Sequence, residues 1–212
     1  MTRGRFIVFE GGEGAGKSTQ ACLLADALRT RGIEALLTRE PGGTPGAEAI
    51  RALLLDPPGR GWPAEAEALL FAAARADHVA QAIRPALEAG SWVISDRFID
   101  SSRAYQGGGG GVPDAEILEL HRIGSRGLLP DVTFLLEAAP DQIARRLARR
   151  DGGESDAIGG RDAAYHADVA AAFARLAESE PARFVRIDGM GAIEETHGRI
   201  LAALAPLPDG RP

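Results

Sequence analysis

The sequence of 212 residues has no asparagine, a single lysine and a single cysteine. The single cysteine, Cys22, excludes an internal disulfide and a cysteine-based metal cluster, and it suits a reducing compartment, so we expect a cytoplasmic protein. No apolar run reaches the roughly 18–20 residues that cross a bilayer, and the first residues lack the apolar stretch of a signal peptide. The formal net charge of −6 argues against a protein that coats nucleic acid by neutralising phosphates. We therefore expect neither a membrane nor a nucleic acid as partner.

The scarcity of lysine is informative about the lysine that remains. Of the 24 basic residues, all except Lys17 are arginine, in a chain rich in alanine and glycine. Such a composition indicates a bias toward GC-rich codons, which replaces lysine wherever arginine will serve. Lys17 therefore marks a position where lysine itself is needed.

The apolar pattern predicts an α/β protein. Short β-branched and aromatic runs at residues 5–10, 35–38, 91–95, 131–136 and 184–187 are typical of buried strands. Helical spacing occupies residues 17–30, 46–55, 64–89, 114–126 and 140–150, resumes near residue 162, and ends with residues 192–204. We expect Cys22 to pack in the core from the first of these helices. Alternation of strands and helices predicts a five-stranded parallel sheet wrapped by helices, and without a linker it predicts one domain spanning 1–212.

A phosphate-binding loop follows the first predicted strand. Residues 11–18 read GGEGAGKS and match G-x-x-x-x-G-K-[ST], with a strand before and a helix after. Its backbone N–H groups can surround phosphate oxygens, while the lysine reaches the β- and γ-phosphates and the serine offers a hydroxyl to Mg²⁺. The alternative, a glycine-rich turn with a solvated lysine, accords poorly with this context. The residues expected to bind the phosphates of ATP are Gly11, Gly12, Glu13, Gly14, Ala15, Gly16, Lys17, Ser18 and Thr19.

The loop predicts nucleotide binding and leaves the reaction open. Switch-type GTPases read guanine with N-K-x-D, which this chain lacks because it has no asparagine and no second lysine. Helicases and recombinases usually need a larger core and a basic surface. A small phosphotransferase and a nucleotide-gated interaction protein remain.

Asp96 and Arg97 follow the third predicted strand. A carboxylate at that strand end can hold Mg²⁺ through water beside the phosphate loop, and the arginine can clamp a phosphoryl oxygen. A plain surface salt bridge is the alternative interpretation of the pair.

At this point the chain resembles the bacterial thymidylate kinases, which are P-loop nucleoside-monophosphate kinases that phosphorylate dTMP to dTDP with ATP. The resemblance depends on FEGGEGAGKSTQ (9–20), TREPGGT (38–44), IRALLL (50–55), EALLFAAARADH (67–78), DRF (96–98), SSRAYQG (101–107) and LLPDVT (128–133). These blocks occur in order over residues 5–135. The resemblance implies a P-loop kinase fold with a short lid, Mg²⁺ as the metal and a homodimer.

The resemblance also implies the role of each matching residue. Glu13 would accept a hydrogen bond from the deoxyribose 3′-hydroxyl, and Phe71 would stack on thymine. Tyr105 would fill the space beneath C2′ and so exclude ribose. The polar edge of the base would meet Arg75 and Ser102, the monophosphate would meet Arg39, Arg51 and Arg97, and Gln106 belongs to the same substrate site. Without the resemblance, Phe71 would be a core residue and Arg75 a solvated arginine.

The predicted lid, about residues 149–161, departs from the family pattern. Where the family carries a D-R-x-E-like element, this chain has Asp-Ala-Ile-Gly at 156–159. A phosphate loop without a basic residue of its own beside Lys17 implies a transition-state cation from the lid. We rank the candidates Arg150, Arg149 and then Arg161, with Arg97 as the alternative source. With Lys17 and Asp96, these residues would carry in-line transfer from ATP to dTMP; another nucleoside monophosphate is the alternative acceptor.

Overall fold

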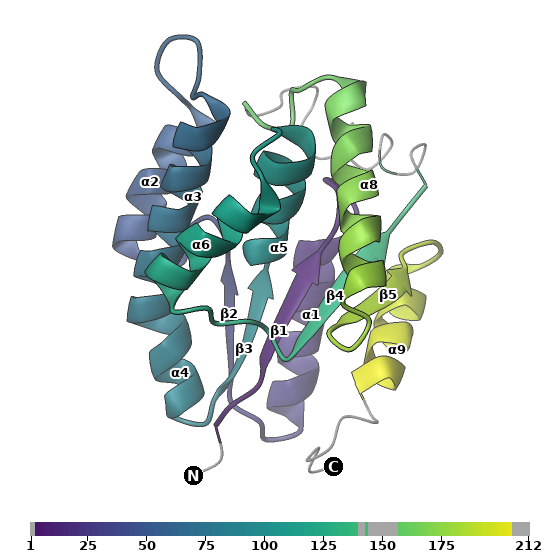
Figure 1. The fold of residues 1–212 in the computed structure, drawn as a ribbon. Helices are drawn as coiled ribbons and strands as arrows, with labels where there is room; N and C mark the ends of the chain where they lie inside the picture. Colours follow the sequence, from purple (N-terminus) through teal and green to yellow (C-terminus); the bar gives the residue numbers. More distant parts are fainter. Residues whose placement is uncertain (1–2, 140–142, 144–156, 205–212) are drawn as a thin grey trace.

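The computed structural model describes residues 3–139, 143 and 157–204 (Figure 1). The predicted helix 140–150 therefore lies outside the described residues, except for residue 143, and so does the predicted lid up to residue 156. The elements are β1 (Phe6–Glu10), α1 (Lys17–Thr30), β2 (Ala35–Arg39), α2 (Pro45–Leu55), α3 (Ala64–His78), η1 (Val79–Ile83), α4 (Arg84–Glu88), β3 (Trp92–Asp96), α5 (Ile99–Ser102), η2 (Arg103–Gly109), α6 (Asp114–Ser125), β4 (Val132–Glu137), α8 (Ala163–Ser179), β5 (Phe184–Asp188) and α9 (Ile193–Leu204).

The strands form the predicted five-stranded parallel sheet. Their order is β2-β3-β1-β4-β5, and every neighbouring pair is parallel. Phe9 of β1 and Arg39 of β2 both pair with Asp96 of β3. The carboxyl ends of these three strands therefore meet at one edge of the sheet, where ligands bind in folds of this class.

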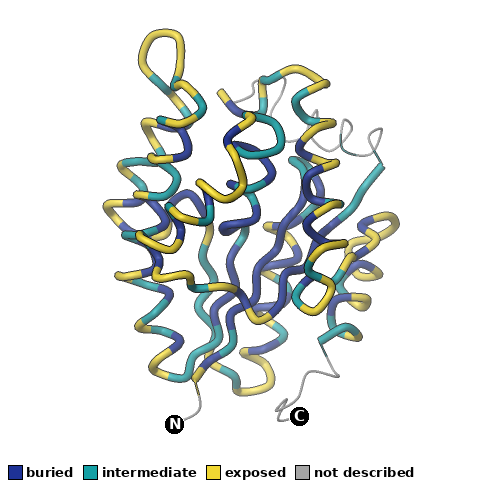
Figure 2. Tube along the Cα trace, viewed as in Figure 1, coloured by how far each residue is buried: buried dark blue, intermediate teal, exposed yellow. Residues whose placement is uncertain are grey.

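Side chains of β1 alternate between two apolar layers. Ile7 and Phe9 pack with α1 and α9 on one face of the sheet, and Phe6 and Val8 pack with η1, α4 and α5 on the other. A third cluster joins β4 and β5 to η2 and α8. Figure 2 shows the central strands buried and the outer sides of the helices exposed. Burial on both faces explains why the strands are almost continuously apolar in sequence.

The structure differs from the sequence-based predictions in three respects. The helix expected over 64–89 is interrupted by the π-helical turn η1. The helical stretch formed by α5 and η2 was not predicted. The prediction that Cys22 packs in the core is wrong, since its side chain is exposed. The buried stripe of α1 instead contains Ala21, Leu24, Ala25 and Leu28.

Candidate active site

The phosphate loop connects β1 to α1 at the carboxyl edge of the sheet. Gly11 has φ +133°, and a Cβ there would lie 2.4 Å from the carbonyl oxygen of Leu136, so that position requires glycine. Helix α1 begins at Lys17, which directs its first N–H groups toward the loop. The ammonium of Lys17 donates to the carbonyl of Gly12 at 2.7 Å. The loop therefore has the backbone geometry of an anion site.

Lys17 is buried in a position that disfavours its charge. Burial and the neighbouring charge of Arg97 lower the pKa of Lys17. Phosphate oxygens bound in the loop would favour the protonated lysine, because opposite charges at short range offset the cost of desolvation. A buried lysine in this position is suited to an anionic ligand.

Ser18 and Asp96 form a pair of oxygen ligands beside the loop. The hydroxyl of Ser18 donates a hydrogen bond to Oδ2 of Asp96. Oδ1 of Asp96 is buried and has no hydrogen-bond partner among the described residues. A hydroxyl and a carboxylate with an unused oxygen fit Mg²⁺, which takes one or two protein ligands together with phosphates and water. No group of three His, Cys, Asp or Glu side chains in the described part of the chain forms a separate metal site.

Arg97 has an unusual backbone conformation, and hydrogen bonds fix both its backbone and its side chain. Its φ is +72°, and its N–H donates to the carbonyl of Phe9 at 2.9 Å. Its guanidinium donates to the carbonyl of Gly11 at 3.3 Å, to the hydroxyl of Ser101 at 3.1 Å and to the hydroxyl of Tyr105 at 3.2 Å. The side chain is thereby fixed at the mouth of the phosphate loop.

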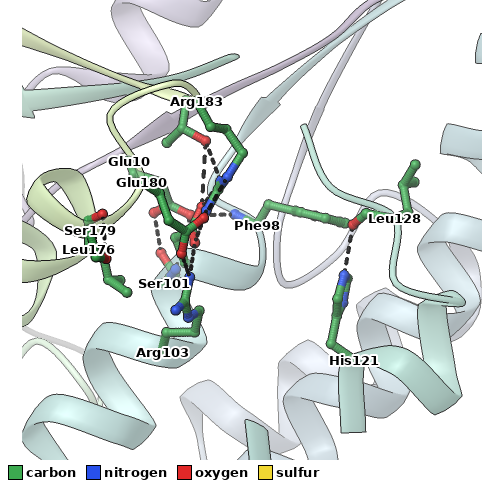
Figure 3. A network of polar contacts seen from close by, with 12 residues as sticks. Glu10, Phe98, Ser101, Arg103, His121, Leu128, Leu176, Ser179, Glu180 and Arg183 are labelled. Carbon is green, nitrogen blue, oxygen red and sulfur yellow. Dashed lines mark hydrogen bonds and ion pairs between the residues drawn. The ribbon is translucent and has the colours of Figure 1, made fainter. Parts of the chain in front are cut away.

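Glu10, which the sequence analysis did not single out, anchors the turn that carries Arg97. Its carboxylate is fully buried and accepts from the N–H of Phe98 at 2.8 Å, the N–H of Ser101 at 3.0 Å and the hydroxyl of Ser101 at 2.6 Å (Figure 3). Burial and the nearby charge of Asp100 raise the pKa of Glu10. An acidic residue at the end of an otherwise apolar strand was the signal that could have identified it.

A cluster of buried ion pairs fixes the start of η2. Asp100 is fully buried between Arg103, at 3.3 Å, and Arg183, whose two terminal nitrogens lie 2.5 and 2.9 Å from the carboxylate. Glu180 joins the same two arginines at 2.5 and 2.6 Å (Figure 3). The cluster ties α5 and η2 to the segment between α8 and β5.

One cavity of about 690 Å³ joins the phosphate loop to Phe71 in the middle of α3. Most of the predicted site residues line it: Glu13, Gly14, Ala15, Gly16, Lys17, Ser18, Thr19, Arg39, Arg51, Phe71, Asp96, Arg97, Tyr105 and Gln106. The structure therefore brings together residues from six separate sequence blocks. Gly11 and Gly12, the first two residues of the loop, do not line the cavity.

The cavity collects positive charge from β2 and α2. Arg39 donates to Glu48 at 3.0 and 3.2 Å, and Arg51 donates to the carbonyl of Pro41 at 2.7 Å. Together with Arg97, these side chains place guanidinium groups around a common space. Forked guanidinium groups in this number are typical of a phosphate site.

Arg75 and Ser102 lie behind the cavity wall. Arg75 is buried and donates to Ser102 at 2.8 Å and to Glu40 at 2.8 Å. The alternative of a solvated Arg75 is wrong, because Glu40 compensates its charge inside the protein. His78 also contacts Glu40, at 3.1 Å, and Thr38, at 2.7 Å, so this buried acid links β2 to α3.

The lid arginines divide into two groups. Arg149 and Arg150 lie outside the described residues. Arg161 is described and does not line the cavity; it contacts Glu67 and Tyr165 instead.

The other part of the cavity wall includes residues that no sequence motif identifies. This part of the wall contains Gln20, Gly189, Ile193 and Thr196. Gln20 donates to the carbonyl of Ile193 at 3.0 Å and so joins α1 to α9. The last three residues are far from the motifs in sequence and carry no distinctive chemistry, so only the fold identifies them.

Comparisons with known proteins agree with this geometry. The family model described as thymidylate kinase matches residues 9–200. A thymidylate kinase of Rhizorhabdus wittichii is 56% identical over 204 residues, covering 96% of this chain and 98% of that protein. One from Bradyrhizobium sp. is 49% identical, covering 91% and 85%.

A solved structure supports the same assignment at the level of the fold. The crystal structure of thymidylate kinase from Ehrlichia chaffeensis aligns with a TM-score of 0.73 at 32% identity, over 95% of this chain and 99% of that one. Within the part that the structure describes, no helix is long and apolar enough to cross a bilayer. From the family match and these relatives, the chain is a P-loop kinase that belongs to the thymidylate kinase family.

Proposed function

We propose that the protein transfers the γ-phosphoryl group of ATP to the 5′-phosphate of dTMP. The observation that carries this proposal is that one cavity joins the phosphate loop to Arg39, Arg51 and Arg97 and to Phe71. A triphosphate in the loop and a monophosphate among the arginines would share that space. Such proximity is the main requirement of phosphoryl transfer.

The donor side would be held by the loop and α1. Backbone N–H groups of residues 11–16 and the start of α1 would bind the β- and γ-phosphates, with Lys17 neutralising their charge. The adenine base would lie toward Ile193 and Thr196, which line the cavity beyond the loop.

Ser18 and Asp96 would hold Mg²⁺. Their contact and the unused Oδ1 of Asp96 support this assignment. When bound, Mg²⁺ would neutralise and orient the phosphate oxygens of ATP.

The acceptor side would be held by the arginines and η2. Arg97 reaches the centre of the site through its contacts with Gly11 and Tyr105 and would bind a 5′-phosphate oxygen together with Arg39 and Arg51. Phe71 offers a face for the thymine ring, and the ring of Tyr105 would occupy the volume of a ribose 2′-hydroxyl. Glu13 would take the 3′-hydroxyl, with Arg75 and Ser102 near the base and Gln106 lining the same end.

The transfer itself needs little acid–base chemistry. The acceptor phosphate is already anionic, so the protein's tasks are alignment and neutralisation of charge on the transferred group. Lys17 and Arg97 would supply part of that charge, and Arg149 or Arg150 would supply the remainder.

Other proposed properties rest on the composition, charge and chain pattern, and the lid and homodimer rest on the family resemblance. We propose that residues 1–212 act as one domain, with the lid at 149–161, and as a homodimer in the cytoplasm. We propose that neither nucleic acid nor a membrane is a partner.

The test is direct detection of dTDP from dTMP and ATP. Purified protein should form dTDP and ADP in equal amounts with Mg²⁺, and Lys17→Ala should lose turnover while keeping its circular dichroism spectrum. A well-folded Lys17→Ala variant with more than a few per cent of wild-type turnover would contradict the role of the loop. Protein that binds ATP without forming any diphosphate from a nucleoside monophosphate would instead be a nucleotide-gated interaction protein.

A further inference from the structure

Arg161 forms a fixed contact outside the cavity. One terminal nitrogen donates to Oε2 of Glu67 in an ion pair, and the other donates to the hydroxyl of Tyr165 at 2.6 Å. Its guanidinium lies 4.5 Å from the centre of the Tyr165 ring. The hydroxyl of Tyr165 in turn donates to the carbonyl of Tyr105 at 3.0 Å. Arg161 thus connects the start of α8 to α3 and to η2.

Glu67 contacts Gln106 as well as Arg161. Glu67 is buried, and its Oε1 accepts from Nε2 of Gln106 at 2.8 Å. An ionised carboxylate can only accept hydrogen bonds, so the amide of Gln106 must turn its NH₂ group toward Glu67. The amide oxygen is then directed the other way, on a residue that lines the cavity.

Gln106 lies at the end of the cavity where a base would bind. Glu67 and Phe71 are one helical turn apart on the same face of α3, and Gln106 contacts Glu67. Ile158 packs in the same cluster as Phe71 and Tyr105. The oriented amide therefore borders the space beside the face of Phe71.

The chain that leads to Arg161 is packed against this end of the cavity. Ala157 donates its N–H to the carbonyl of Leu55 at 3.4 Å. A Cβ on Gly159 would lie 2.5 Å from Oε2 of Glu13, so the backbone there approaches Glu13 closely. In place of the arginine and glutamate of a D-R-x-E element, this segment has Ala157 and Gly159, and its ion pair is made by Arg161.

We propose that Arg161 and Glu67 are positioning residues that set base selectivity by fixing the orientation of the Gln106 amide. This inference rests on the proposed function. Thymine and uracil carry a hydrogen-bond donor at N3, whereas N3 of cytosine is an acceptor. An amide oxygen directed at the base pairs with the former and repels the latter.

Loss of Arg161 would release this orientation. Without Arg161, the carboxylate of Glu67 loses the partner that holds it in place, and the NH₂ group of Gln106 loses its fixed acceptor. The amide would then rotate and present its NH₂ group to the base. The Glu67→Gln substitution has a similar effect without changing shape, because glutamine offers both a donor and an acceptor.

The experiment compares kcat/KM for dTMP and dCMP in the wild type and four variants. Wild type should prefer dTMP strongly. Arg161→Met and Glu67→Gln should each lower the dTMP to dCMP ratio by about tenfold or more, the effect of one reoriented hydrogen bond. The change should fall on KM for the monophosphate, with kcat and KM for ATP within about twofold of wild type. Arg161→Lys, which keeps the ion pair with Glu67, should retain most of the selectivity.

Arg122→Met is the matched control. Arg122 forms an exposed pair with Glu119 on α6, so its loss removes an arginine–glutamate contact far from the cavity. This variant should have the wild-type ratio. Thermal unfolding of each variant reports its fold, and if Arg161→Met does not fold, the isosteric Glu67→Gln decides.

Two results would count against the inference, and they differ. If dTMP and dCMP turnover fall in equal proportion in folded Arg161→Met and Glu67→Gln, the contact is only a structural brace and the inference is wrong. If wild type does not phosphorylate dTMP, the proposed function fails first, and the inference fails with it.

Discussion

The hydroxyl of Ser101 donates a 2.6 Å hydrogen bond to Glu10 while accepting one of 3.1 Å from Arg97. A buried acid at the end of β1 is thereby connected through one hydroxyl to a cation of the active site. Because Glu10 also holds the N–H groups of Phe98 and Ser101, the turn after β3 has one fixed shape. Arg97 is positioned by the sheet itself.

Removing that hydroxyl should impair catalysis more than stability. In Ser101→Ala, Glu10 keeps two backbone donors, while Arg97 loses one of its three partners. We expect kcat/KM for dTMP to fall by about tenfold, since small displacements of a positioning group are costly in rate. Steady-state kinetics and thermal unfolding measure both effects.

Ser91→Ala is the matched control for this prediction. Ser91 donates to Glu34 at 3.1 Å on the surface, and its loss should leave kinetics unchanged. Equal kinetics in the Ser101→Ala and Ser91→Ala variants would show that Ser101 does not position Arg97.

Tyr105 should discriminate against ribose through its ring. Tyr105→Ala should raise kcat/KM for UMP relative to dUMP by about tenfold or more, because the volume of the 2′-hydroxyl becomes available. Tyr105→Phe should keep the discrimination and lose some turnover, since the hydroxyl accepts from Arg97. Kinetics with both nucleotides test this, and an unaltered ratio in the alanine variant would remove Tyr105 from this role.

Arg149 and Arg150 remain the predicted source of the transition-state cation. An arginine that acts only in the transition state contributes about 10³–10⁵ in turnover in related phosphoryl transfers. Single alanine variants should therefore identify one residue whose loss lowers kcat and kcat/KM together, with KM for ATP nearly unchanged. We rank Arg150 before Arg149. Turnover within a few fold of wild type in all three single variants and in the triple variant that adds Arg161→Ala would assign the role to Arg97 instead.

His121 should make stability depend on pH. It is buried, donates from Nε2 to the carbonyl of Leu128 at 2.7 Å and packs edge-on against Phe98. Burial and the charge of Arg75 lower the pKa of His121 from 6.5 to about 4. The unfolded chain therefore takes up a proton first as the pH falls. The free energy of unfolding therefore contains a contribution from neutral His121 that is fully present above pH 6.5. Between pH 6.5 and pH 4 this contribution falls by about 2–3 kcal/mol.

The comparison with His121→Gln isolates this effect. Glutamine can donate to Leu128 and does not titrate, so its stability should fall less on acidification. Urea unfolding at about pH 7 and about pH 4.5 gives the difference between the two proteins. A difference that does not change with pH would show that His121 is not the group responsible.

Strands and motifs were accessible from sequence because their signals are local. The apolar runs of β1 and β3 predict buried strands within a residue or two, and the phosphate loop is a continuous pattern. The α5–η2 stretch was missed because its glycines and serines have low helix propensity. It is stabilised instead by distant contacts, such as Tyr105 against Phe173 and the Asp100 cluster.

The residues that support the site could not be predicted from sequence, because their roles also depend on distant contacts. Glu40 and Glu67 look like ordinary surface acids in sequence, and only the fold buries each beside a donor from another element. Phe71 and Arg75 were assigned by resemblance alone, since an aromatic and an arginine one turn apart on a helix are otherwise unremarkable. Arg161 was placed among the catalytic candidates by its charge, and its partners could not be known.

The most direct test of this account is the specificity of phosphoryl transfer. Wild-type protein with ATP and Mg²⁺ should be assayed against dTMP, dUMP, dCMP, UMP, AMP and GMP, with Lys17→Ala as the inactive control. The account predicts the highest kcat/KM for dTMP, a moderate loss for dUMP, whose missing methyl group is worth roughly 1–3 kcal/mol of packing, and a much larger loss for dCMP. A higher kcat/KM for any other monophosphate than for dTMP would contradict it.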